Sequence, residues 1–171
     1  MRLFIAFDAP SEELIKLQKN FDINGIKLVK EFHLTLKFLG EVNDDRVELI
    51  KEKLRKIKFQ PLEVSFDKLG VFPNENYIRV IWIALQPEDK ITELKEKVED
   101  VLKDLFTKEG GFKAHITLGR VKFISDRDKL IQGLKADVPK IKFLVDKFML
   151  YKSELRREGP IYSLVEEFPL Y

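Results

Sequence analysis

The 171-residue chain has no cysteine, only two histidines, few Asn and Gln, and no long apolar segment. The absence of cysteine excludes a disulfide framework and thiolate chemistry, and it is typical of cytosolic proteins, so we expect a cytoplasmic location. The apolar segments are too short for a transmembrane helix. The formal net charge is only +2, so the chain is not a generally basic nucleic-acid binder, and any RNA has to bind at a local patch.

The residues that are present are typical of a globular protein. Apolar residues make up 44% of the chain and include 14 Phe, and the length suffices for one domain with a substantial core. Charged residues make up 35%, and together with the scarcity of Asn and Gln this indicates a thermophilic source. We expect residues 1–171 to form a single domain and the protein to be a monomer.

The apolar periodicity predicts the elements of an α+β protein. Strands are predicted at 2–8, 26–30, 33–40, 62–70, 76–85, 114–121, 140–145, 147–155 and 161–170. Helices are predicted at 9–20, 43–57, 88–106 and 125–134. In the strand at 33–40, alternation predicts His33, Thr35 and Lys37 on one face, with Leu34, Leu36 and Phe38 on the other.

The order of these elements repeats, which predicts an internal duplication with repeats near 2–70 and 76–155. The segment "LFIAFDAPSEELIKL" resembles "VIWIALQPEDKITEL", and "HLTLKF" resembles "HITLGR". The expected fold is two pseudo-symmetric lobes of antiparallel-rich sheet with outer helices and an active-site cleft between the lobes. Equivalent positions would then face each other, and His33 would lie opposite His115.

The two histidines occur in the same phrase, His-x-Thr-Leu, at His33 and His115. On a strand this spacing puts an imidazole and a hydroxyl on one face. Two such pairs suit in-line phosphoryl transfer: one imidazole accepts a proton from the attacking oxygen, and the other gives one to the leaving oxygen. The hydroxyls of Thr35 and Thr117 would hold the non-bridging oxygens. The ordinary histidine pKa of about 6.5 suits either role.

Three other roles stay open from the residues alone. A single histidine on a strand is more often a structural residue, although the chance of finding Thr two positions after both histidines is only about one in two thousand. A metal site needs more ligands, and only Glu31 and Glu41 lie near the first motif, with no His-x-His spacing and no cysteine. The same residues also fit a module that binds a phosphate ligand, such as an RNA end, without turning it over.

Four segments, "RLFIAFDAP", "EFHLTLKFLGEV", "FKAHITLGRVK" and "YKSELRREGPIYSLVEEFPL", resemble the RNA 2′,3′-cyclic phosphodiesterases of the 2H phosphoesterase superfamily, also named 2′-5′ RNA ligases. The resemblance covers essentially the whole chain. It implies opening of RNA 2′,3′-cyclic phosphate ends to 2′-phosphates without metal or cofactor, or joining of tRNA halves by the reverse chemistry. It also implies His33 as proton donor and His115 as proton acceptor, with Thr35, Thr117 and Arg120 binding the phosphate.

Further residues near the motifs are weaker candidates for RNA contacts. Aromatic side chains that could stack a terminal base, if they do not simply pack in the core, are Phe38, Phe72 and Tyr151. Cations that could line the path of the RNA, if they are not simply solvated, are Lys30, Lys37, Lys113, Lys122, Lys152, Arg156 and Arg157.

Overall fold

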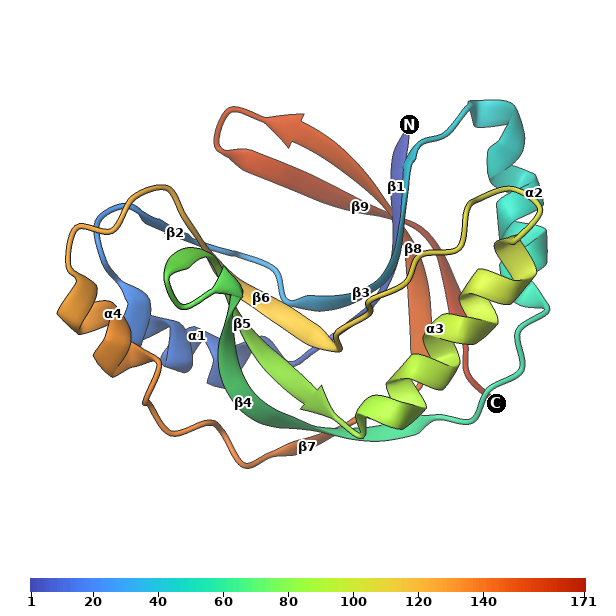
Figure 1. The fold of residues 1–171 in the computed structure, drawn as a ribbon. Coiled ribbons are helices and arrows are strands. Elements are labelled where there is room, and N and C mark those ends of the chain that lie inside the picture. The colour runs from blue at the N-terminus through green and yellow to red at the C-terminus, as the bar shows by residue number, and fades with distance from the viewer.

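The computed structural model describes all residues 1–171 as two antiparallel sheets with four α-helices (Figure 1). Sheet A has the order β3 (His33–Glu41), β1 (Arg2–Asp8), β8 (Lys147–Arg156), β9 (Gly159–Pro169). Sheet B has the order β2 (Ile26–Leu28), β6 (His115–Val121), β5 (Tyr77–Gln86), β4 (Leu62–Asn74), β7 (Lys142–Val145). The helices are α1 (Ser11–Gln18), α2 (Asp44–Arg55), α3 (Glu88–Leu102) and α4 (Arg127–Gly133). The α+β class predicted from the sequence is confirmed.

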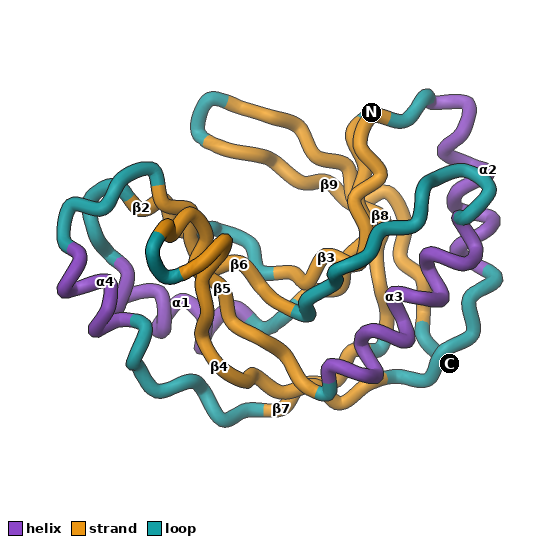
Figure 2. The backbone as a smooth tube through the Cα atoms, in the orientation of Figure 1, coloured by secondary structure: helices purple, strands orange, loops and turns teal.

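The two sheets share one plan, but each takes strands from both halves of the chain. Sheet A reads β3-β1-β8-β9, and sheet B repeats this order as β6-β5-β4-β7, with β2 added beyond β6. Strand β4, from the first half of the chain, therefore pairs beside β5, whereas β8 from the second half pairs beside β1. The helices cross over in the same way: α1 follows β1 but packs near β6, and α3 follows β5 but packs against β3. Figure 2 shows the helices on the outer sides of the sheets.

A single apolar core lies beneath both sheets. One cluster of 37 buried apolar residues includes side chains from β1, β3, β5, β6 and β8. Along β1 the residues Leu3, Ile5 and Phe7 belong to this cluster, and Phe4 and Ala6 between them do not. Each sheet thus has a core face and an opposite face, which we call the site face. Each fully buried large side chain contributes about 1.5–3 kcal/mol, so the core faces fix the register of the strands.

The predicted alternation of β3 is wrong from Lys37 onward, because the strand contains a β-bulge. Ala6 pairs with Thr35 and Ile5 with Lys37, which leaves Leu36 as an extra residue. The bulge turns Lys37 to the core face, where it is only 2% exposed and its Nζ lies 2.9 Å from an oxygen of Glu99. Lys37 therefore cannot line an RNA path. The next residue, Phe38, is turned to the site face and is 63% exposed.

Strand β6 has the same bulge at the same place in its motif. Trp82 pairs with Thr117 and Ile81 with Gly119, which leaves Leu118 unpaired. The residue after the bulge, Gly119, is buried, and Arg120 then emerges on the site face. The two His-x-Thr strands thus share one backbone irregularity, and Arg120 takes the place in sheet B that Phe38 takes in sheet A.

Candidate active site

Strands β3 and β6 bring the two His-x-Thr pairs together where the sheets meet. The two strands are in contact along this line (Figure 1). His33, Thr35, His115 and Thr117 are all partly exposed, while the residues between and after them in the motifs are buried. The bulges explain why the motif stops at Thr: the face presented by His and Thr ends at the extra residue. We call these four side chains the His–Thr site.

His115 is held as a neutral imidazole with one nitrogen free. Its Nδ1 lies 2.7 Å from the carbonyl oxygen of Lys113. A carbonyl only accepts hydrogen bonds, so Nδ1 carries the proton and Nε2 keeps its lone pair. Burial lowers the pKa of His115 and the positive charges of Arg120 and Lys113 lower it further, against the hydrogen bond to Lys113, which raises it. The edge of the ring also contacts Phe72, with 5.1 Å between ring centroids.

His33 lies in a different electrostatic setting. Its ring contacts Phe4 and Tyr162, each with 5.1 Å between ring centroids. Burial lowers the pKa of His33 to about 4, while the carboxylate of Asp8 raises it and Arg120 lowers it. Asp8 is the residue paired with His33 in the β1–β3 ladder. At the equivalent place beside His115, the residue on β5 is Ala84, which carries no charge.

The carboxylate beside His33 is held in place by a tyrosine. The hydroxyl of Tyr151 donates to Asp8, at 2.8 Å and 2.9 Å from its two oxygens. Tyr151 also stacks on Phe4, with 5.4 Å between ring centroids. Asp8 is therefore oriented by a fixed side chain, so its negative charge stays near the imidazole of His33.

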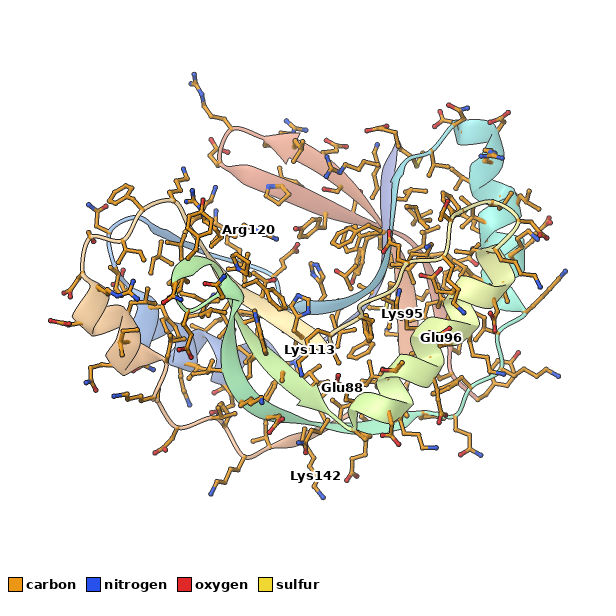
Figure 3. All side chains as sticks on the ribbon, viewed as in Figure 1. Glu88, Lys95, Glu96, Lys113, Arg120 and Lys142 are labelled. Carbon is orange, nitrogen blue, oxygen red and sulfur yellow. The ribbon has the colours of Figure 1, made fainter.

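Three hydrogen-bond donors at the site have no partner within the protein. The hydroxyls of Thr35 and Thr117 make no hydrogen bond, and Arg120 makes neither a hydrogen bond nor an ion pair. Arg120 is exposed and lies between sheet B and the β8–β9 hairpin (Figure 3), and its charge acts on both His33 and His115. Unpaired donors around two imidazoles suit a bound anion with several oxygens, such as a phosphate.

The weaker predictions have mixed outcomes. Phe72 and Tyr151 lie beside the two histidines. Lys113 forms an ion pair with Glu88 at 3.1 Å, visible in Figure 3. Glu154 pairs with both Lys152, at 3.3 Å, and Arg156, at 2.9 Å. Three of the predicted cations are exposed and form no ion pair: Lys30, Lys122 and Arg157.

Four residues of the site were not predicted from the sequence: Phe4, Asp8, Trp82 and Tyr162. Trp82 lies on β5, and its ring is beside that of His115. Its Nε1 is the one buried side-chain polar atom that lacks a hydrogen-bond partner. A Cβ added at Gly70 would lie 2.2 Å from the indole ring, so only glycine leaves room for it. Strand pairing brings these residues to the histidines, and the only sequence signal was their place on strands of the repeat.

Other features of the surface lie away from the His–Thr site. A surface hollow of about 670 Å³ is lined mainly by acidic residues of α3, which would repel a phosphate. No group of three or more His, Cys, Asp or Glu side chains is gathered in a way that suits a metal ion. None of the helices combines the length and the apolar character needed to cross a membrane.

Comparison with known proteins gives consistent matches along the whole chain. The family described as LigT like Phosphoesterase matches residues 6–82 and again 83–162. An RNA 2′,3′-cyclic phosphodiesterase of Methanocaldococcus jannaschii is 40% identical, covering 98% of this chain and 100% of the relative. One of Archaeoglobus fulgidus with the same name is 37% identical, covering 98% and 99%. These relatives come from thermophiles, in line with the predicted source.

Solved structures match equally far. A protein of Thermus thermophilus superposes with a TM-score of 0.84 at 28% identity, covering 99% of this chain and 98% of its own. Escherichia coli LigT in complex with 3′-AMP superposes with a TM-score of 0.77 at 25% identity, covering 99% and 96%.

Proposed function

The chain belongs to the LigT-like phosphoesterase family of the 2H phosphoesterases, as its motifs predicted, and from this premise we propose that it hydrolyses RNA 2′,3′-cyclic phosphate ends to 2′-phosphomonoesters. Relatives that bear the name RNA 2′,3′-cyclic phosphodiesterase support the substrate class. One observation carries the mechanism: of two imidazoles on matching strands, one is fixed with a free lone pair and the other lies beside a carboxylate.

In the proposed reaction His115 is the general base and His33 the general acid. Nε2 of His115 takes a proton from water while the water oxygen bonds to phosphorus. The bond from phosphorus to the 3′-oxygen breaks, and His33 gives its proton to that oxygen. The product carries a 2′-phosphate and a free 3′-hydroxyl. Thr35, Thr117 and Arg120 hold the non-bridging oxygens, on which negative charge is concentrated in the transition state.

The charges around the two rings support this direction. Arg120 disfavours an imidazolium at both rings. Lys113 adds to this effect at His115, which suits a base, whereas Asp8 favours an imidazolium at His33, which suits an acid. Without a ligand, burial lowers the pKa of His33 to about 4. A cyclic phosphate carries one negative charge, and placing it next to His33 favours the protonated ring. Substrate binding therefore includes uptake of a proton by His33.

The test is to incubate the protein, in the presence of EDTA, with a short RNA that ends in a 2′,3′-cyclic phosphate. A product that carries a 2′-phosphate and has gained about 18 Da, the mass of one water molecule, supports hydrolysis with the 3′-oxygen as leaving group. A 3′-phosphate product would mean that the 2′-oxygen of the ribose, and not the 3′-oxygen, is the leaving group. Joining of tRNA halves assigns the ligase activity, and tight binding of intact RNA without turnover assigns a binding module.

A further inference from the structure

The proposed reaction determines on which side of the phosphorus the RNA lies. In-line attack puts the water on the His115 side and the leaving 3′-oxygen on the His33 side. The ribose that carries this oxygen, and with it the rest of the RNA, therefore lies over the site face of sheet A. This placement rests on the proposed function, and it puts further RNA contacts on β1, β8 and β9.

Strand pairing places Arg2, Ser153 and Tyr162 in one row across that face. Arg2 pairs with Ser153, and Ser153 pairs with Tyr162. The ring of Tyr162 reaches the His–Thr site, since it contacts both His33 and Phe4 at 5.1 Å between centroids. Neighbouring strands lie about 4.8 Å apart, so Arg2 begins about two strand spacings from Tyr162, at the end of β1 opposite Asp8 and His33. The row thus leads outward from the catalytic imidazole.

Arg2 is a cation without an acidic partner. It is exposed and makes no ion pair and no side-chain hydrogen bond. Glu41 is its pairing partner on β3, but the carboxylate of Glu41 lies 3.6 Å from the amino terminus instead. By contrast, the nearby cations Lys152 and Arg156 both pair with Glu154. The guanidinium of Arg2 is therefore available to an external anion.

The charges of two guanidinium groups act on Tyr162. Burial raises the pKa of Tyr162, the charge of Arg120 lowers it, that of Glu31 raises it and that of Arg2 lowers it. The hydroxyl of Tyr162 makes no hydrogen bond within the protein. Arg120 is assigned to the cyclic phosphate, which leaves Arg2 one step further along the RNA.

We propose that Arg2 and Tyr162 form a subsite for the phosphodiester that precedes the terminal nucleotide, so that the enzyme acts on RNA ends in preference to cyclic mononucleotides. Tyr162 contacts the terminal ribose or base beside His33, and the guanidinium of Arg2 binds the next phosphate in a charge-assisted contact.

The experiment compares adenosine 2′,3′-cyclic phosphate with the dinucleotide ApA that ends in a 2′,3′-cyclic phosphate. The native protein should have a kcat/KM at least about tenfold higher on the dinucleotide, the effect of a single good charged contact. Arg2→Gln should bring this ratio close to one. Arg46→Gln is the matched control, because it removes an exposed arginine of α2 on the outside of the molecule. This variant should keep the native ratio of kcat/KM between the two substrates.

A substrate change tests the same contact from the other side. Replacing the internal phosphate of the dinucleotide by an uncharged methylphosphonate should reduce kcat/KM of the native protein by the factor that Arg2→Gln causes. Combined with Arg2→Gln, the methylphosphonate should cause no further loss, because both changes remove one interaction.

The outcomes separate the subsite from the proposed function. A native protein that favours neither substrate, or an Arg2→Gln variant that keeps the native ratio, overturns the subsite while hydrolysis itself stands. An equal loss on both substrates also overturns it, because Arg2 would then act on the cyclic phosphate. If the native protein opens neither substrate, the proposed function fails, and the subsite fails with it.

Discussion

The two His-x-Thr strands solve one backbone problem with two different side chains. At each bulge the carbonyl oxygen of the extra residue accepts a hydrogen bond from a buried side chain. Lys95 on α3 donates to the oxygen of Leu36 at 3.1 Å, and Gln18 on α1 donates to the oxygen of Leu118 at 2.9 Å. Gln18 and Lys95 occupy equivalent places on the crossed-over helices, and both are nearly fully buried. The shape of each His-x-Thr strand is thus set by a helix that follows a strand of the other sheet.

The difference lies in charge. Gln18 is neutral, and its amide nitrogen donates to two carbonyl oxygens, those of Val29 and Leu118. Lys95 belongs to a buried ionic group, because Glu99 accepts from it at 2.8 Å and from Lys37 at 2.9 Å. Burial raises the pKa of Glu99, but the hydrogen bonds from the two lysines outweigh it and lower the pKa.

The surroundings of the two bulges explain this difference. In sheet B the strand β2 pairs alongside β6, and a Cβ at Gly119 would meet Ile26 at 3.2 Å, so the position after the bulge stays small. In sheet A the strand β3 is at the edge, and α3 fills the space with long charged side chains. A similar backbone therefore does not imply similar electrostatics, and a pseudo-symmetric site can hold one acid and one base.

Removing either imidazole should have the largest effect and should reveal the difference between the two. His33→Gln and His115→Gln should each lower kcat/KM by at least about 100-fold. The remaining activity of His33→Gln should rise with pH to a plateau, because it depends on deprotonated His115. That of His115→Gln should fall as pH rises, because it depends on protonated His33. A pH series of single-turnover rates measures both profiles. If the activity of His33→Gln falls with pH and that of His115→Gln rises, the two roles are exchanged.

Breaking the buried ionic group should have the next largest effect. Glu99→Gln leaves Lys37 and Lys95 without a compensating charge, which should lower the free energy of unfolding by about 3–5 kcal/mol. Urea denaturation monitored by the fluorescence of Trp82 measures this. Glu96→Gln is the control on the same helix, since Glu96 pairs only with exposed Lys108 at the surface. Equal midpoints for the two variants would show that the buried group does not stabilise the strand.

Removing the neutral donor of sheet B should cost less. Gln18→Leu leaves the carbonyl of Val29 without the amide, while Leu118 keeps the backbone N–H of Val29 at 3.0 Å. One buried unsatisfied group costs about 1–3 kcal/mol in the same denaturation experiment. Gln132→Leu, on α4, is the matched control. A loss as large as that of Glu99→Gln would mean that charge is not the reason for the difference between the bulges.

These features differ in how far the sequence predicted them. The histidines and threonines were found because His is so rare here that two copies of one phrase stand out, and apolar periodicity was enough for the elements. The bulges were not visible, since "HLTLKF" alternates as any strand does and the extra residue is defined only by its partners on β1. For the same reason Lys37 was assigned to the wrong face, and Asp8 and Tyr162 were missed. The single-domain organisation, the monomeric state and the cytoplasmic location stay predictions.

The smallest predicted effect concerns the carboxylate that distinguishes His33 from His115. Asp8 raises the pKa of His33, so Asp8→Asn should lower it. Because the acid must be protonated, a lower pKa reduces the active fraction at neutral pH. The optimum of kcat/KM therefore moves to lower pH, by less than about one pH unit for one exposed charge. The His115→Gln background isolates this shift, since activity there follows His33 alone. Glu31→Gln, which removes a neighbouring carboxylate that is not among the causes of the His33 shift, should leave the midpoint in place. An unchanged midpoint in Asp8→Asn would mean that the direction of the site is set beside His115, by its hydrogen bond to Lys113 and by the charge of Lys113.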